Sequence, residues 1–212
     1  DLSHNNISEL HVSTFQTLTE LKELHLSHNE IREIPSFFLH KTKKLTDVNL
    51  SFNKIATIDY FAFSGTTDVR KLNLTHNQLA TLNRKMIETL SNLTHFDISF
   101  NRITALKPDN MKILQHLVYF DVSGNSLKKL DNKTFAGLVK LEQLFLSHCN
   151  LSVIVPGTFS PLVNLKRLDV SYNQLKTLDS NCLPSSLDHM KIIGIDTNKF
   201  NCSFYEKNFE MT

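Results

Sequence analysis

One stretch of 24 residues limits the possible folds of this chain more than any other feature. It runs from Leu117 to Lys140 and reads LVYFDVSGNSLKKLDNKTFAGLVK. Apolar residues stand at its positions 1, 4, 6, 11, 14, 19 and 22, and an Asn stands at position 9. The same pattern recurs every 24 residues, and position 1 falls at Leu21, Leu45, Val69, Leu93, Leu117, Leu141 and Leu165. Such a period predicts a solenoid, in which each repeat is one coil and stacked coils share a continuous core.

Positions 4 to 7 of each repeat alternate between apolar and polar residues, which is the period of a half-buried strand. We therefore expect one short strand per repeat and a parallel sheet along the stack. We also expect positions 2, 3, 5, 7 and 8 to point out from this sheet. Position 19, where Phe recurs, is predicted to form a packed spine. The outer side of the coils has few strong helix signals, so short helical or irregular segments are expected there.

Position 9 is an Asn in nearly every repeat: Asn5, Asn29, Asn53, Asn77, Asn101, Asn125 and Asn173. A buried Asn has enough donors and acceptors to bond backbone groups that a tight turn leaves unpaired. Cys149 holds this position in one repeat. We interpret it as a buried thiol of the same ladder, with a reactive or bridging thiol as the alternative.

Both ends of the chain depart from the repeat. Asp1 to Ile7 matches the second half of a repeat, so we expect the chain to begin inside one, without an N-terminal cap. Leu2, Ile7 and Leu10 would then be exposed and favour a homo- or hetero-oligomer. After Leu178 the period slips. We expect a solenoid over residues 1–200 and the start of a C-terminal cap over residues 201–212.

Charge and hydropathy exclude several classes of partner. The 23 basic and 21 acidic residues give a net charge of +2 and do not form blocks, so we expect no nucleic-acid or anionic-membrane surface. No apolar run approaches the ~18 residues that a membrane span needs. We expect no cofactor, because Gly-rich phosphate loops and the HExxH, GxSxG and CxxC motifs are absent.

Cysteines and glycosylation sequons favour an extracellular location. Cys182 and Cys202 flank the last expected strand in adjacent coils, which predicts a disulfide between them. Pairing with other cysteines, or two free thiols, remains the alternative. Sequons of the Asn-x-Ser/Thr type occur at Asn6, Asn49, Asn73, Asn92, Asn132, Asn150 and Asn201. Seven sequons favour a secreted or cell-surface glycoprotein, and glycans at Asn49 and Asn73 would shield part of the sheet face.

The C-terminal half of the sheet face is the candidate partner-binding surface. Aromatic and Arg residues in a mixed-charge setting match the composition of protein interfaces. The candidate residues are Tyr119, Asp121, Glu142, Phe145, Lys166, Arg167, Asp169 and Tyr172, with Gln143 among them. An ordinary strand surface is the alternative, because strands favour aromatic residues anyway.

Catalytic and metal sites are not predicted. Ser-His pairs occur at Ser3-His4, Ser27-His28 and Ser147-His148, but they recur with the repeat and have no acid or oxyanion hole defined beside them. His4, His25 and His28 lie in a flat column that does not converge on one point, as a metal site requires.

The repeat L-x-x-L-x-L-S-x-N-x-L-x-x-L-x-x-x-x-F-x-x-L resembles the extracellular leucine-rich repeat family. The resemblance implies an α/β horseshoe: a right-handed solenoid with a parallel sheet on its concave face and short helical or irregular segments on its convex face. It also implies members that bind proteins, lipids or glycans without catalysis.

The sequence IDTNKFNCSFY at residues 195–205 is similar to the closing repeat of secreted insect leucine-rich immune proteins. It lacks the paired C-x-C that opens the vertebrate-style C-terminal flanking region. The expected function is recognition of a protein partner or a pathogen-derived ligand by a secreted innate-immune protein. The alternative is an ectodomain of a Toll-like receptor or of an adhesion protein similar to neuronal leucine-rich proteins.

Overall fold

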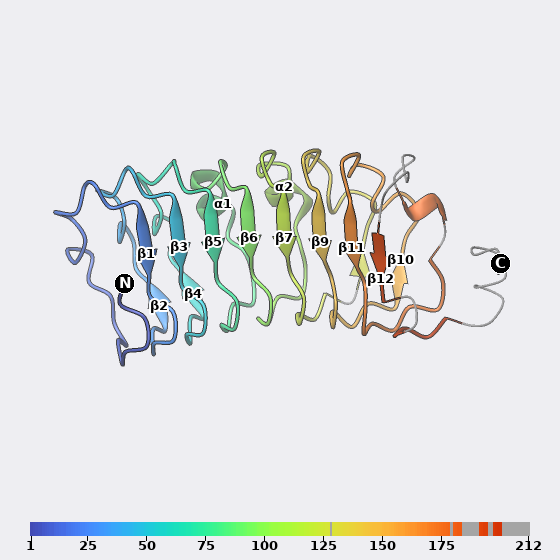
Figure 1. Ribbon diagram of the computed structural model, residues 1–212, viewed down its shortest axis with the longest axis horizontal. Helices are drawn as coiled ribbons and strands as arrows, with labels where there is room; N and C mark the ends of the chain where they lie inside the picture. The colour runs from blue at the N-terminus through green and yellow to red at the C-terminus, as the bar shows by residue number, and fades with distance from the viewer. Residues whose placement is uncertain (128, 179, 184–190, 195–196, 201–212) are drawn as a thin grey trace.

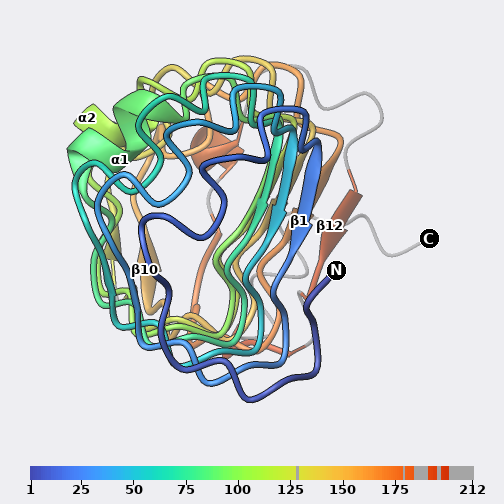
Figure 2. The same ribbon diagram turned by 90° about the vertical axis from the view of Figure 1, so that its left-hand side faces the viewer.

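A computed structural model describes residues 1–127, 129–178, 180–183, 191–194 and 197–200. Its coils are stacked side by side along the long axis of the molecule (Figure 1). Viewed end-on, the main sheet lies on one side of the coils and the helices lie on the other (Figure 2). This is the parallel-sheet solenoid that the period predicts, and the side formed by the sheet is called the sheet face below.

Eight strands, one per repeat, form the main sheet in the order β1-β3-β5-β6-β7-β9-β11-β12. Every pairing is parallel and joins equal repeat positions, so that Asp97 lies opposite Asp121 and Leu168 lies opposite Ile192. Each strand is three residues long, and its middle residue points into the coil. The strands are β1 Glu23–His25, β3 Asp47–Asn49, β5 Lys71–Asn73, β6 His95–Asp97, β7 Tyr119–Asp121, β9 Gln143–Phe145, β11 Arg167–Asp169 and β12 Lys191–Ile193.

The opposite side of the coils is mixed. It carries the helices α1 (Arg84–Thr89) and α2 (Pro108–Met111) and the 3-10 helix η1 (Ser180–Cys182). It also carries two parallel strand pairs: β2 (Glu33–Ile34) with β4 (Thr57–Ile58), and β8 (Lys129–Leu130) with β10 (Val153–Ile154). Helical turns were expected here, but the strand pairs were not. None of the helices within the described ranges has the length and apolar character of a membrane span.

The core runs the whole length of the stack. Phe63, Phe135 and Phe159 at position 19 are fully buried, which confirms the predicted spine. The rings of Phe135 and Phe159 stack with their centroids 5.8 Å apart, as do those of Phe96 and Phe120 under the sheet. Burial of each such side chain contributes roughly 1.5–3 kcal/mol, so neighbouring coils hold each other through these contacts.

The position 9 Asn residues form a ladder that ties each coil to the one before it. The Oδ1 atom of Asn125 accepts the N–H of Ile103 at 2.9 Å. Its Nδ2 atom donates to the carbonyls of Ile98 in the preceding coil at 3.0 Å and of Val122 in its own coil at 2.8 Å. The same pattern is present at Asn29, Asn53, Asn77, Asn101 and Asn173.

Cys149 holds the ladder position in a different way. Its thiol is fully buried and donates to the carbonyls of Val122 at 3.4 Å and Ser147 at 3.5 Å. Burial raises the pKa of this thiol to about 12, which keeps it protonated at neutral pH. The prediction of a buried ladder thiol is therefore confirmed. A thiol has no carbonyl oxygen, so Cys149 has no equivalent of the Oδ1 atom that accepts Ile103 N–H at Asn125.

Replacing a ladder Asn should destabilise the fold strongly. We expect Asn125→Ala to lower the free energy of unfolding by about 2 kcal/mol or more, because backbone groups of two coils lose their partners in a buried setting. Gln78→Ala is the control, since Gln78 is half-buried and follows ladder Asn77 directly. The free energy of unfolding of both variants is measured by urea denaturation. Equal small effects in the two would contradict a stabilising role of the ladder.

Candidate partner-binding surface

A row of ring side chains crosses the sheet face over β6, β7 and β9 and ends at an arginine on β11. The ring of His95 stacks on Tyr119 with the centroids 5.8 Å apart. Tyr119 and Phe145 lie 5.2 Å apart at a tilt of 43°. The guanidinium carbon of Arg167 lies 5.0 Å from the centre of the Phe145 ring, which is a cation–π distance. We call His95, Tyr119, Phe145 and Arg167 the aromatic strip.

Two carboxylates lie next to this strip, on adjacent strands and in register. Asp97 Oδ1 accepts the backbone N–H of Ser99 at 2.9 Å and its hydroxyl at 2.7 Å. Asp121 Oδ1 accepts the N–H of Ser123 at 2.9 Å. The hydroxyl of Tyr119 donates a long bond of 3.4 Å to Asp121 Oδ2. These bonds fix the orientation of both carboxylates but give neither of them a cationic partner.

The pKa values of Asp121 and Tyr119 are both raised, mainly by burial. Burial raises the pKa of Asp121, and the charge of Asp97 raises it further, while hydrogen bonds from Ser123 and Tyr119 oppose the shift. Burial also raises the pKa of the Tyr119 hydroxyl, with added contributions from the charges of Asp121 and Asp97. Both groups are therefore held in a setting that disfavours negative charge.

Two other carboxylates on the sheet face, Asp47 and Glu142, are paired with a cation. Asp47 lies 2.9 Å from the Lys71 ammonium, and Glu142 lies 2.8 Å from the Lys166 ammonium. Burial alone would raise the pKa of Asp47, but its hydrogen bond to Lys71 and the charge of that ammonium help to lower it overall. Within the described part of the chain, no ion pair involves Asp97 or Asp121.

The predicted partner-binding residues fall into separate groups. Tyr119, Asp121, Phe145 and Arg167 come together in or beside the aromatic strip. Glu142 and Lys166 are paired with each other. His95 and Asp97 were not among the predicted residues, and they extend the surface onto β6. A comparison of position 3 across the repeats would have found His95 beside Tyr119, since position 3 holds both.

The remaining two predicted residues lie elsewhere on the face. Asp169 Oδ1 accepts the N–H of Ser171 at 2.9 Å, and its neighbour in register is Phe145. Tyr172 lies beyond the end of β11 and stacks on His148 at 4.4 Å, with 58% of its surface exposed. Tyr172 thus belongs to a second group of rings, formed by position 8 of the repeats.

Five side chains at position 8, from His4 to Phe100, form a stack of rings that we call the ring column. His4, His28, Phe52, His76 and Phe100 follow one another with centroid distances of 4.2 to 4.5 Å. All five have φ between 51° and 56°, the left-handed region that side chains other than glycine seldom adopt. The stack is interrupted at Gly124, where a Cβ would lie 2.6 Å from the Phe100 ring.

Position 7 points to the same side of the sheet as position 5, as expected. The hydroxyls of Ser51 and Ser99 donate to Asn49 Oδ1 and Asp97 Oδ1, both at 2.7 Å. Neighbouring side chains cover this position, and Ser27, Ser51, Ser99, Ser123 and Ser171 are buried. In the Ser27-His28 pair, the Ser27 hydroxyl donates to that of Ser3 at 3.0 Å. Across the described residues, no three His, Cys, Asp or Glu side chains are placed to hold a metal ion.

The sequons differ in how accessible their amide nitrogen is. Asn49 and Asn73 are half-buried neighbours on β3 and β5, and the Oδ1 atom of each accepts the N–H two residues ahead, at 3.1 and 2.9 Å. Asn92 donates from Nδ2 to the Thr67 carbonyl at 2.9 Å, so a glycan there would be attached to a nitrogen that already has a hydrogen-bond partner. Asn6, Asn132 and Asn150 are exposed, whereas Asn201 lies outside the described residues.

Of the two cysteines in the predicted disulfide, Cys182 lies within the described residues and Cys202 does not. Cys182 is fully buried, with its sulfur 3.5 Å from the Ile154 carbonyl. Cys202 lies outside the described residues, so the pairing of Cys182 with Cys202 stays a prediction. The same holds for the C-terminal cap expected over residues 201–212.

A hollow of about 260 Å³ opens on the sheet face over β1, β3, β5, β6 and β7. Its polar walls include His25, the Asp47–Lys71 pair, His95 and Asp97, and Tyr119 closes one end. The strand residues Val48, Leu72 and Phe96 lie beneath it, with their side chains buried in the coils. The hollow therefore adjoins both the aromatic strip and one of the two carboxylates without a cation.

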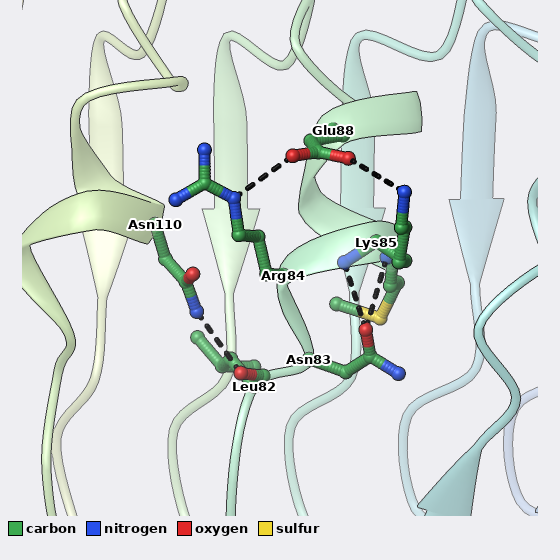
Figure 3. A network of polar contacts seen from close by, with 7 residues as sticks. Leu82, Asn83, Arg84, Lys85, Glu88 and Asn110 are labelled. Atoms are coloured by element: carbon green, nitrogen blue, oxygen red, sulfur yellow. Dashed lines mark hydrogen bonds and ion pairs between the residues drawn. The ribbon is translucent and has the colours of Figure 1, made fainter.

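A larger hollow of about 830 Å³ lies on the opposite side, between the β2–β4 pair and the start of α1. Its polar side chains bind one another (Figure 3): Arg84 Nε lies 2.9 Å from Glu88, and Asn110 donates to the Leu82 carbonyl at 3.0 Å. Asn83 caps α1 by accepting the N–H groups of Lys85 and Met86. Arg84, Asn83 and Asn110 are thus hydrogen-bonded within the chain.

Three comparisons place the fold among known proteins. The family model described as leucine rich repeat matches residues 1–41, 43–103, 91–151 and 146–200. The crystal structure of a TLR13–ssRNA13 complex is similar at 31% identity and a TM-score of 0.76, covering 82% of this chain and 24% of that one. A leucine-rich repeat protein of Leptospira interrogans is similar at 25% identity and a TM-score of 0.85, covering 98% of this chain and 50% of that one. The chain thus spans half or less of these two proteins, and no curated protein matches it.

Removing the charge of Asp97 should lower the pKa of Asp121, because the Asp97 charge raises it. Asp97→Asn keeps the acceptor oxygen, since Asn49 and Asn73 make the same bond at this repeat position. The new residue would create a sequon with Ser99, so the variant is made in a host without N-glycosylation. Carboxyl NMR titration measures the pKa of Asp121. Asp169→Asn is the control that should leave it unchanged, and an unchanged value in Asp97→Asn would contradict the coupling.

Proposed function

Because this chain belongs to the leucine-rich repeat family, we propose that it is a non-catalytic module that binds a protein partner through its sheet face. The family fold and the likeness to TLR13 support a protein-interaction module in general. The site is assigned to the aromatic strip together with Asp97 and Asp121. The predicted residues Glu142, Lys166, Asp169 and Tyr172 would lie at the border of the same interface.

One observation carries this assignment: rings, an arginine and two carboxylates without a cation lie together on a sheet held rigid by the Asn ladder. Rigid aromatic anchors cost little conformational entropy when they bind, and Tyr and Arg are enriched at interface hot spots. The structure of TLR13 was solved with ssRNA13. For the present chain a protein is the better-supported partner, since Asp97, Asp121 and Asp169 place carboxylates where RNA phosphates would need cations.

We further propose an extracellular setting, a C-terminal cap over residues 201–212 and assembly into a homo- or hetero-oligomer. The sequons and the likeness to TLR13 support this setting. Between the two roles considered, the 31% identity to TLR13 supports a receptor ectodomain. The sequence at residues 195–205 supports a secreted innate-immune protein similar to those of insects.

Partner capture tests the binding surface. The chain is immobilised and incubated with proteins secreted by, or displayed on, cells of its source, and the bound proteins are identified by mass spectrometry. A protein captured by the unmodified chain should bind more weakly to the double variant Tyr119→Ala and Phe145→Ala. About tenfold weaker capture is expected, because two anchor side chains are truncated.

Tyr60→Ala is the matched control, because Tyr60 is 60% exposed and lines the hollow on the opposite side. Circular dichroism verifies that all variants are folded. Capture that is undiminished in the double variant, or that is weakened by Tyr60→Ala instead, would refute the sheet face as the binding surface.

The extracellular setting predicts a specific set of modifications. Peptide mapping without reduction should find Cys182 linked to Cys202, and glycopeptide analysis should find glycans at the exposed Asn132 and Asn150. Asn92 should carry less glycan than these two, because its Nδ2 atom is already hydrogen-bonded. Reduced cysteines and unmodified sequons in protein from its natural source would contradict this setting.

A further inference from the structure

The carboxylates of Asp97 and Asp121 form a charge arrangement that the folded chain leaves uncompensated. Like charges directly opposite each other on neighbouring strands are destabilising. Their Oδ1 atoms are held by Ser99 and Ser123, and the Tyr119 hydroxyl reaches Asp121 Oδ2 only at 3.4 Å. Within the described residues, the hydrogen bonds found at these two carboxylates all come from neutral donors.

The cations closest in the repeat pattern are already engaged. Lys71 on β5 pairs with Asp47 at 2.9 Å, on the side away from β6. Arg167 on β11 lies over the Phe145 ring, at 5.0 Å from its centre. The sheet face therefore combines unpaired negative charge with two cations that have other partners.

Aromatic walls adjoin the same two carboxylates. The rings of His95 and Tyr119 stack beside them, and both residues also line the hollow of about 260 Å³. The side chains of Val48, Leu72 and Phe96 beneath the hollow are buried, so the two rings supply the apolar surface that a partner side chain can cover. A flexible apolar stem with a positively charged end suits such a site, because the stem covers apolar surface while the charge reaches the carboxylates.

We propose that β6 and β7 bind a lysine or arginine side chain of a protein partner, with its charged end between Asp97 and Asp121. The stem of that side chain lies along the rings of His95 and Tyr119. Complementary charge is the basis of the assignment, since a partner cation relieves a repulsion that the free protein retains. This inference rests on the proposed function and specifies the chemistry of the partner.

Small probes test the inference without a known partner. The amide NMR signals of Asp97, Ser99, Asp121 and Ser123 are followed while N-acetyl-arginine amide or N-acetyl-lysine amide is added. Both probes should shift these signals in a saturable way, whereas the uncharged N-acetyl-norleucine amide should not. Asp97→Asn and Asp121→Asn should each weaken probe binding about tenfold or more, since each removes a charge-assisted hydrogen bond.

Asp169→Asn is the matched control for probe binding alone, because Asp169 lies at the border of the proposed interface but has no carboxylate in register on either neighbouring strand. Asp169 holds the same repeat position and makes the same bond to the N–H two residues ahead, at 2.9 Å, but its strand neighbours in register are Phe145 and Ile193. Its loss should change probe affinity by less than about twofold. All three variants create sequons, so every protein is made in a host without N-glycosylation.

The outcomes separate this inference from the proposed function. Shifts that are equal at all exposed carboxylates, or that persist in Asp97→Asn and Asp121→Asn, overturn the inference. An oligouridylate RNA that shifts these four amides while the cationic probes do not also overturns it. If the probes fail but partner capture still depends on Tyr119 and Phe145, the inference is wrong and the proposed function stands. If capture does not depend on the sheet face, both are wrong.

Discussion

The hydrogen bonds of the buried Asn ladder are the interaction on which the rest of this structure depends. Each Asn side chain bonds backbone groups of its own coil and of the preceding coil, so it fixes the spacing and the register between them. Because these groups are buried, their pairing matters more than the strength of any single bond would suggest. Apolar contacts alone would hold the coils together without specifying how they align.

Fixed register has a direct consequence for the surface. Side chains at equal repeat positions are brought beside one another along the sheet, whatever their chemistry. At position 8 this places rings in a stack, and their contacts help to offset the cost of left-handed backbone at residues such as His28 and Phe52. At position 5 it places Asp97 beside Asp121, where the effect is unfavourable. The folded chain tolerates this repulsion between the two carboxylates. We attribute their placement to the binding of a cationic side chain of the partner.

The features that follow from the period could be predicted from the sequence. One strand per repeat, the Asn ladder, the spine at position 19 and the buried Cys149 all depend only on repeat position. The burial of position 7 could not be obtained in this way, because it depends on the side chains that surround this position at position 5 and in the neighbouring coil. The strand pairs β2–β4 and β8–β10 were also missed, since their short segments carry no periodic signal that separates them from irregular chain.

The candidate surface was predicted in part. Tyr119, Asp121, Phe145 and Arg167 were named from composition, and they do lie together. Their contacts run diagonally, from position 3 on one strand to position 5 on the next, and such contacts depend on side-chain rotamers. His95 and Asp97 were missed because the sequence analysis placed the surface only from β7 onwards.

Hydrogen exchange at the ladder amides tests the account most directly. Ile103 and Leu151 each donate their N–H to an Asn Oδ1 atom at 2.9 Å, whereas the equivalent acceptor for Leu127 is replaced by the Cys149 thiol. If the Asn side chains hold the coils in register, Ile103 and Leu151 should be strongly protected. Leu127 should exchange roughly tenfold faster, the effect expected from one missing hydrogen bond. Equal exchange rates at all three amides would contradict the central role of the ladder.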